Sequence, residues 1–348
     1  MNLYELIDKL QREHDLADAE FAALIENTDE QVREYLHEKA RAVREKHYGR
    51  KVYIRGLIEY SNYCKNDCLY CGIRRSNRNA ERYRLSKEEI LQCCEAGYDL
   101  GFRTFVLQGG EDPHFTDERM VDIVSTIRRK YPDCAITLSL GERGKESFEK
   151  LYAAGANRYL LRHETADACH YSLLHPKEMA LQTRMENLRA LKAIGYQTGA
   201  GMMIGSPGQS TQSLIKDLRF LQDLQPQMVG IGPFIPHHDT PFKDEKAGTV
   251  ELTLTMLSIV RLMLPSVLLP ATTALGTIDG DGRIKGMNAG CNVVMPNLSP
   301  SDYRAKYLLY DNKIATGDEA AESLASLRRH MSAAGYEVVT DRGDHKAD

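Results

Sequence analysis

The sequence predicts an α/β fold, a complete (βα)8 TIM barrel with a helical extension before it and a helical tail after it. From Lys51 onward, short apolar or β-branched runs alternate with longer amphipathic segments, a pattern typical of βα units and a parallel sheet. Eight of the runs are strand candidates, and eight parallel strands close a barrel. They cover residues 52–61, 104–110, 135–141, 158–164, 197–205, 228–235, 268–276 and 292–298.

The segments around the strands carry helical patterns. Leu3, Ile7 and Leu10 share one helix face, and Ser86 has the position of an N-cap for a helix that starts at Lys87. The connection between the last two strands is short and rich in glycine, so we expect it to be irregular. The predicted parts are a helical extension over 1–48, the barrel over 49–315, and a helical tail packed on the barrel over 316–348.

An open, doubly wound sheet shows the same alternation of strands and helices. Such a sheet binds nucleotides at a glycine-rich turn after its first strand, whereas here the first strand leads into EYSNYCKNDC, residues 59–68. In a barrel, the loops after the C-terminal ends of the strands form the active face. The barrel is therefore the preferred fold, and this cysteine-containing loop lies on its active face.

The composition indicates a soluble globular protein whose partners are neither nucleic acids nor membranes. Of the 348 residues, 42% are hydrophobic and 27% charged, and the net charge of −4 gives no basic field for phosphates. The charged N-terminal stretch lacks the apolar core of a signal peptide, and no later run reaches about 18 apolar residues. We expect a cytoplasmic protein, and in that reducing compartment a cysteine cluster indicates metal binding or catalysis rather than disulfides.

Three cysteines, Cys64, Cys68 and Cys71, follow the first strand in a C-x3-C-x2-C arrangement. Zinc ribbons combine a C-x2-C pair with a second pair of cysteines or histidines, and the other five cysteines form no such pair. Zinc is therefore disfavoured. Three thiolates can instead hold three corners of a cubane iron–sulfur cluster, which leaves the fourth iron open to a substrate or cofactor.

The stretch CKNDCLYC, with an aromatic residue before the third cysteine, resembles the signature of the radical S-adenosylmethionine (SAM) superfamily. The resemblance implies one [4Fe-4S] cluster on the three cysteines, with SAM bound to the open iron. It also implies that an electron from the cluster cleaves SAM into methionine and a 5′-deoxyadenosyl radical. Such a radical requires a closed cavity, which a complete barrel supplies.

Further stretches resemble the SAM site of that superfamily, several of them at the ends of predicted strands. LQGGEDPHF resembles the motif that meets the methionyl amino group, RHET supplies a carboxylate for the ribose hydroxyls, and GAGMMIGSPGQ resembles the adenine cradle. Each also has an ordinary structural explanation, as a turn, a solvated helical arginine or a core strand. The residues implied for SAM are Tyr70, Gly109, Gly110, Glu111, Ser139, Glu164, Arg184, Met203, Ile204 and Gly205.

Longer stretches, among them RYLLRHETAD, GIGPFIPHHDTPF, LPATTALGTI and AGCNVVMPNLSPSDYR, resemble the [FeFe]-hydrogenase maturases of the HydE type, from about residue 35 to 315. This resemblance implies an enzyme that processes a cysteine-bound Fe(CO)2(CN) precursor during assembly of the two-iron subcluster. A partner maturase would deliver the precursor. Transient contacts with other maturases and with a reductant follow from the same resemblance.

Two alternatives stay open beside this function, and a third, sulfur insertion, is disfavoured. Methylornithine synthases share the GEDP and NAGxN motifs but generally lack the RHET and ATTA motifs. An iron–sulfur carrier or scaffold would hold the cluster without cleaving SAM. Sulfur insertion, as in biotin synthase, needs a second cluster inside the barrel, and the remaining cysteines fit burial as small apolar side chains better. They are Cys93, Cys94, Cys134, Cys169 and Cys291, and residues 313–327 contain none, so we predict a single cluster.

Polar side chains on the predicted strands suggest an anionic substrate. Arg55 and Arg162 can face inward, and because an unpaired cation in a dry cavity is costly, two of them imply an anionic ligand. Barrel carboxylates that satisfy the arginines, and tyrosines that only pack the last helix, are the structural alternatives. PHHDT, residues 236–240, is predicted to be a loop rather than a metal site. The predicted substrate residues are Arg55, Thr137, Arg162, Met228, Thr272, Thr273, Tyr307 and Tyr310.

Overall fold

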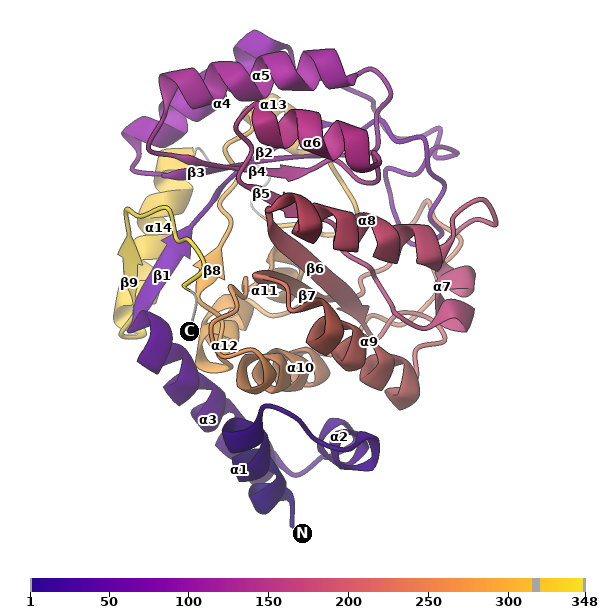
Figure 1. Ribbon diagram of the computed structural model, residues 1–348, viewed down its shortest axis with the longest axis vertical. Helices are drawn as coiled ribbons and strands as arrows, with labels where there is room; N and C mark the ends of the chain where they lie inside the picture. The colour runs from indigo at the N-terminus through magenta and orange to yellow at the C-terminus, as the bar shows by residue number, and fades with distance from the viewer. Residues whose placement is uncertain (1, 315–319, 347–348) are drawn as a thin grey trace.

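The computed structural model of the protein describes residues 2–314 and 320–346. Three helices precede the first strand, as the sequence predicted, and they lie together at the lower edge of Figure 1. Asn2 caps the first of them, because its side chain accepts a hydrogen bond from the Glu5 N–H at 2.9 Å. The bounds of these helices are Leu3–Glu13 (α1), Asp18–Ile25 (α2) and Glu30–Tyr48 (α3).

Six strands form one parallel sheet, in the order in which they occur along the chain. Each of the first five is followed by one helix or two before the next strand begins, and the sixth by three, which confirms the predicted βα alternation. The strands are β2 (Gly56–Ser61), β3 (Thr104–Gly109), β4 (Ala135–Ser139), β5 (Arg158–Leu160), β6 (Gln197–Ile204) and β7 (Met228–Pro233). The helices are α4 (Lys87–Asp99), α5 (Asp117–Lys130), α6 (Lys145–Ala153), α7 (Ala168–Leu174), α8 (Leu181–Ile194), α9 (Thr211–Leu224) and α10 (Val250–Met263).

A second, three-stranded sheet has the order β8-β1-β9. Its strands are β1 (Lys51–Ile54), β8 (Val293–Val294) and β9 (Glu337–Val339), so the first predicted strand is divided at Arg55 into β1 and β2. At Arg55 the chain changes its partner on one edge, from β9 to β3. On its other edge it stays beside the segment of β8, since the Arg55 N–H donates to the Val294 carbonyl at 3.0 Å and the Leu57 N–H to the Pro296 carbonyl at 2.9 Å.

The predicted strand over 268–276 is wrong beyond Ala271. Leu268 bridges to Met228, and Pro270 bridges to Val293, each as a single parallel bridge. Pro270 has no N–H for a longer ladder, and Thr272 then caps a helix. The named strands therefore form two hydrogen-bonded sheets rather than one closed sheet. The connection predicted to be irregular contains the short helices α11 (Thr273–Ile278) and α12 (Gly282–Asn288), and α13 (Ser301–Arg304) follows β8.

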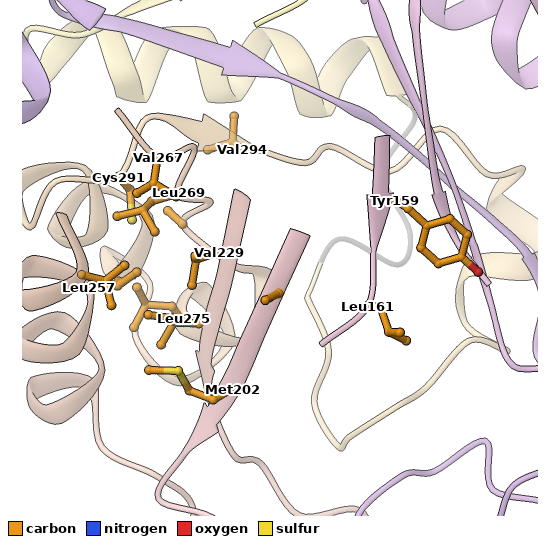
Figure 2. Close-up of a cluster of buried hydrophobic side chains, with 14 of the residues drawn as sticks. Tyr159, Leu161, Met202, Val229, Leu257, Val267, Leu269, Leu275, Cys291 and Val294 are labelled. Carbon is orange, nitrogen blue, oxygen red and sulfur yellow. The ribbon is translucent and has the colours of Figure 1, made fainter. Parts of the chain in front are cut away.

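The largest apolar core lies between the six-stranded sheet and its helices. Figure 2 shows part of it, where Val229 of β7 and Leu257 of α10 lie in one cluster of buried side chains with Leu269. Because side chains alternate along a strand, Met228 faces the other way. It packs in a separate cluster with Tyr53, Leu268 and Val293. The face of β7 that carries Met228 is therefore the face on which the strands surround an interior.

The C-terminal region contains a helix, within the predicted helical tail, and a strand that the sequence analysis did not anticipate. Helix α14 (Ala320–Ala333) is followed by β9, which pairs with β1. After β9 the chain reaches Arg158 at the start of β5, whose Nη2 lies 2.7 Å from Asp344 Oδ1 and 2.8 Å from the Arg342 carbonyl oxygen. None of the helices within 2–314 and 320–346 has both the length and the apolar character needed to cross a membrane.

Replacing Arg158 by methionine should lower the free energy of unfolding by about 1–3 kcal/mol, because it leaves the partly exposed Asp344 carboxylate and the Arg342 carbonyl without their charged donor. Arg158 is fully buried. Desolvation of the Asp344 carboxyl raises its pKa, but the charge of Arg158 and hydrogen bonding outweigh this effect and lower the pKa to about 2. Because the pKa of Asp344 is lower in the folded state than the unfolded-state value of 3.8, the ionised carboxylate stabilises the fold above pH 3.8. This stabilisation is lost as the pH falls toward 2.

Urea unfolding at pH 7 and pH 3 tests this expectation. The difference between the variant and the unchanged protein should shrink at the lower pH. Arg129→Met, at an exposed position on α5, is the matched control and should unfold like the unchanged protein. Equal losses in the two variants would contradict a specific role for the Arg158–Asp344 pair.

Candidate active site

The three cysteines lie in the long loop between β2 and α4, on the right-hand side of Figure 1. Cys64, Cys68 and Cys71 are free thiols and partly exposed, and Cys68 Sγ lies 3.8 Å from Met179 Sδ. Desolvation raises the pKa of Cys68 to about 12 and raises that of Cys71 as well. These thiols therefore stay protonated unless a cation binds them, which is the usual behaviour of cysteines that ligate a metal.

The spacing of the thiols fits a cluster better than a single ion. Within the described ranges, only His237, His238 and Asp239 bring three possible ligand atoms within 4.8 Å of one another. The three cysteines are therefore farther apart than the ligands of one ion, as expected when each thiolate binds a different iron of a cubane. The residues present fit that cluster.

The guanidinium of Arg82 holds the cysteine loop together. Its nitrogens donate to four backbone carbonyls, those of Asn62, Ile73, Arg74 and Asn77, at up to 3.0 Å. These carbonyls come from both ends of the loop, so one side chain fixes its path. No signal in the sequence distinguished Arg82 from its neighbours, because its partners are backbone atoms.

Replacing Arg82 by glutamine should leave the protein folded but weaken its hold on iron. Four carbonyls lose a charged donor, and each such hydrogen bond contributes about 1.5–3 kcal/mol. We expect reconstituted Arg82→Gln to release iron to a chelator at least about tenfold faster than the unchanged protein, and to unfold at a lower temperature because the same hydrogen bonds are lost. Arg128→Gln is the control, since the Arg128 guanidinium also donates to backbone carbonyls, those of Pro132, Cys134 and Gly155, away from the cysteine loop. Equal release rates for the unchanged protein and Arg82→Gln would disprove the role.

The GGE stretch lies directly against the cysteine loop. A Cβ on Gly110 would overlap the Tyr63 carbonyl and the Cys64 side chain, so only glycine fits there. Glu111 Oε2 lies 3.2 Å from Lys65 Nζ, and its Oε1 accepts from the Glu142 N–H at 3.0 Å. Gly109 ends β3 and packs on Tyr60, and Ser139 ends the neighbouring β4. The structure therefore brings all four predicted residues to the ends of these two strands.

Glu164 has a left-handed backbone, with φ of 64°, which is uncommon for a residue other than glycine. Its N–H donates to the Gly201 carbonyl at 3.0 Å, and the neighbouring His163 forms a buried contact of 3.2 Å with Asp217. Glu164 Oε2 lies 3.0 Å from Arg162 Nη2, yet neither atom has a hydrogen-bond partner among the described residues. The turn therefore presents a carboxylate and a guanidinium that retain free bonding capacity.

Arg184 is buried, so its alternative as a solvated surface group is wrong. Its Nε pairs with Glu142, and its Nη1 donates to the Arg162 carbonyl at 2.8 Å. Arg184 thus joins the turn of Arg162 and Glu164 to the loop after β4, whose Glu142 N–H donates to the Glu111 carboxylate. The sequence analysis missed Glu142, because nothing in its local sequence indicates this contact.

The predicted adenine cradle lies at the end of β6. Met203 packs in a small apolar cluster with Leu174 and Phe234, against which Tyr70 and Phe242 lie. Ile204 is buried, and Gly205 has a positive φ of 73° and no room for a Cβ next to Gly248. The structure therefore brings Tyr70 of the cysteine loop to the predicted cradle.

Inside the strands, Arg55 and Thr137 are buried with unused polar atoms. Arg55 Nη1 lies 3.0 Å from Met228 Sδ, a weak acceptor, while its Nε and Nη2 and the Thr137 Oγ1 have no partner within the described chain. Burial lowers the pKa of Arg55 well below its ordinary value. The structural alternative, in which carboxylates of the barrel bind the arginines, therefore does not hold for Arg55 among the described residues. Arg162, in contrast, lies beside Glu164.

The remaining predicted residues line the end of the strands nearer the cysteine loop. Thr272 caps α11, close to Gly232 of β7, and Thr273 begins that helix. Burial raises the pKa of Tyr307 far above its ordinary value and that of Tyr310 to about 12. Both phenols therefore stay protonated.

A buried ion pair beside these tyrosines was not predicted. Lys313 Nζ lies 2.5 Å from Glu59 Oε1 and donates to the Tyr307 carbonyl at 2.9 Å. Asn297 donates to the other Glu59 oxygen at 2.8 Å. This pair joins the segment after α13 to β2.

Two further sets of residues have structural roles. The rings of His237 and His238 stack, the Asp239 N–H donates to His237 Nδ1 at 3.1 Å, and His238 Nδ1 lies 2.7 Å from Asp311 Oδ1. Hydrogen bonds within the loop and to Asp311 therefore fix the positions of these histidines.

Of the remaining cysteines, Cys169 is exposed near the start of α7, contrary to the predicted burial. The others are buried as predicted, at Cys93, Cys94, Cys134 and Cys291. Residues 315–319, within the stretch predicted to lack a second cluster, lie outside the described residues.

Comparisons with known proteins agree with this geometry. The model of the radical SAM superfamily matches residues 58–221. The chain is 43% identical to the [FeFe] hydrogenase maturase subunit HydE of Thermotoga maritima, over 98% of this chain and 97% of that protein. It is 32% identical to 3-methylornithine synthase of Methanosarcina acetivorans, over 91% and 89%. The crystal structure of methylornithine synthase (PylB) superposes with a TM-score of 0.84, at 29% identity, and covers 96% of this chain and 97% of that one. The structure of the maturase HydG superposes at 0.81 and 19% identity over 96% and 75%, which shows the fold alone.

Proposed function

Because the chain belongs to the radical SAM superfamily, on the branch of the maturase HydE, we propose that it acts in the assembly of the [FeFe]-hydrogenase two-iron subcluster. It is a radical SAM enzyme, and its cofactors are a [4Fe-4S] cluster and SAM. The observation that carries the proposal is the 43% identity over nearly the full length of both chains. The substrate we propose is a cysteine-bound Fe(CO)2(CN) species.

We assign roles to the side chains from the contacts they make. Cys64, Cys68 and Cys71 hold the cluster, which, when reduced, supplies the electron that cleaves SAM. Glu164, with free bonding capacity beside Arg162, binds the ribose hydroxyls. Arg184 orients the methionyl carboxylate. For the methionyl amino group we propose Gly109, Gly110 and Glu111, with Ser139 next to them, and for adenine Tyr70, Met203, Ile204 and Gly205.

The anionic iron substrate binds in the interior. Arg55 and Arg162 supply charge, and their unused nitrogens are the reason to place an anion there. Thr137, with its unpartnered hydroxyl, and the Thr272–Thr273 pair supply hydrogen bonds, while Met228 forms an apolar wall. Tyr307 and Tyr310 exclude water, which a radical reaction requires.

The same proposal covers the architecture and surroundings of the chain. We infer a complete barrel, supported by the single bridges at Leu268 and Pro270 between β7 and β8. We divide the chain into an extension over 1–48, a barrel over 49–315 and a tail over 316–348, whose boundary falls outside the described residues. We also propose a cytoplasmic location, no membrane or nucleic acid partner, and transient contacts with other maturases and a reductant.

A mutase that acts on lysine, like 3-methylornithine synthase, is the second candidate, favoured by the close superposition on PylB. Such an enzyme needs carboxylates for the second ammonium group. Among the described residues of the interior, Glu59 already pairs with Lys313, and the unpartnered groups include the guanidinium of Arg55. The Glu164 carboxylate, which also has an unpartnered oxygen, lies beside Arg162 and is assigned to SAM, so the interior favours an anion over a diamine.

Anaerobic reconstitution tests the function. The protein should bind about four irons per chain and release 5′-deoxyadenosine when dithionite and SAM are added. Turnover of the iron–cysteine species, and none of lysine, should follow. Methylornithine from lysine would favour the mutase, and a loaded cluster without SAM cleavage would favour a carrier or scaffold.

A further inference from the structure

We propose that the exposed face of the cysteine loop is the docking site of an acidic protein that carries single electrons. The inference rests on the proposed function, because it concerns how the cluster is reduced. Residues 62–84 contain six basic and two acidic side chains, a formal charge of +4, in a chain whose net charge is −4. The loop is therefore a basic region on an otherwise acidic protein.

Most of the charged groups in the loop are used within the protein. Arg74 pairs with Asp67 at 2.7 Å, Arg84 with Asp112 at 2.7 Å, and Lys65 with Glu111 at 3.2 Å. Arg82 donates to the four backbone carbonyls described above. Both acidic residues of the loop are also neutralised, since the second of them, Glu81, pairs with Lys306.

Arg75 and Arg78 are the exceptions. Both are exposed, and within the part of the chain that the structure describes neither has a carboxylate within 4.0 Å. A fixed, unpaired guanidinium on the surface is a group that can pair with a carboxylate of another molecule. The face therefore presents two such groups, while the acids near them are engaged elsewhere, Glu81 with Lys306 and Asp239 with Asn79.

Backbone contacts place this face over the cysteines. The Arg75 N–H donates to the Asn66 carbonyl at 2.8 Å, and Asn66 lies between Cys64 and Cys68. On the other side, Asn77 Nδ2 donates to the carbonyl of Gly72, the residue after the last cysteine, at 2.7 Å. A protein that contacts Arg75 and Arg78 therefore lies next to the ligands of the cluster.

The reaction requires such a partner. Each cleavage of SAM consumes one electron, so the cluster must be reduced again by an external one-electron donor before the next cleavage. The carrier loses one electron and the cluster gains it, with no proton or leaving group transferred. Opposite charges raise the rate of encounter and orient small, transient redox complexes. A partner with a negative surface is the one that two unpaired arginines favour.

The test compares a protein donor with a small one. Arg75→Glu/Arg78→Glu should lower 5′-deoxyadenosine formation driven by reduced flavodoxin, an acidic one-electron carrier, by at least about tenfold. The rate driven by dithionite, which needs no docking site, should stay unchanged. In the unchanged protein the flavodoxin-driven rate should fall as salt is raised from 50 to about 300 mM.

A matched control carries the same change in charge elsewhere. Arg129→Glu/Arg329→Glu alters exposed positions on α5 and α14 and should leave both rates unchanged. Equal loss with both donors would assign the arginines to the structure of the loop and overturn the inference. So would an unchanged flavodoxin rate in the variant, or an unchanged protein that accepts electrons from dithionite but not from flavodoxin. If dithionite itself gives no cleavage, the proposed function fails instead.

Discussion

Replacing Cys68 by serine is expected to abolish both the cluster and the cleavage of SAM. Cubane clusters are held by thiolates, and Cys68 lies at the centre of the three-cysteine loop, where desolvation raises the pKa of its thiol. A serine hydroxyl is still harder to deprotonate and is a poor ligand for iron in such a cluster. Iron should fall from about four per chain to background, and 5′-deoxyadenosine should not form.

Cys169→Ser is the control for this expectation. Cys169 is an exposed free thiol on α7, so the same chemical change there should leave iron content, the electron paramagnetic resonance of the reduced cluster and SAM cleavage unaltered. Thermal unfolding of the two apo-variants should agree. A Cys68→Ser protein that keeps its iron and cleaves SAM would remove the basis of the cluster assignment.

The second large effect is expected at Arg162. The Arg162→Ala variant should keep the cluster and still cleave SAM with dithionite, but conversion of the iron substrate should fall at least about 100-fold. Loss of a charge that is desolvated by pairing with a ligand costs about 2–5 kcal/mol, and the Nε atom of Arg162 is buried with no other partner within the described chain. The measurement is product formed per 5′-deoxyadenosine released.

The Arg162→Ala variant also removes the cation beside Glu164, because the two side chains lie next to each other. Arg162→Lys, which keeps a charge near Glu164, should recover part of the conversion. Arg189→Ala, at an exposed arginine of α8 that pairs with Asp223, should behave like the unchanged protein. Normal conversion by Arg162→Ala would show that the substrate binds elsewhere.

The fold was predictable where local pattern decides structure. Strands such as β3, β4 and β6 have apolar runs bounded by clear helices, and the structure places them within a few residues of the prediction. The prediction over 268–276 was wrong because a threonine, a good strand residue, is also a good helix cap, and Thr272 serves as the cap. Strand β9 was missed because three residues carry no periodic signal, and its pairing with β1 joins distant parts of the chain.

Some residues of the candidate site could likewise be predicted from the sequence, and others could not. The three cysteines could be found from spacing alone, since the chemistry of a cluster imposes that spacing. Arg82, Glu142 and Lys313 could not, because their partners are backbone atoms or residues far away in the sequence. The unusual backbone of Glu164 also had no signal, as nothing in RHET indicates a left-handed residue.

The pairing of β1 has a consequence for how the protein is made. β1 is the first strand to leave the ribosome, yet its two neighbours, β8 and β9, come from Val293–Val294 and Glu337–Val339 near the other end of the chain. Both edges of β1 therefore stay unpaired until synthesis is nearly finished, and unpaired strand edges favour aggregation. Contacts this distant in sequence also slow folding. Nascent chains of this protein should therefore depend on chaperones until translation ends, and premature termination should yield insoluble fragments.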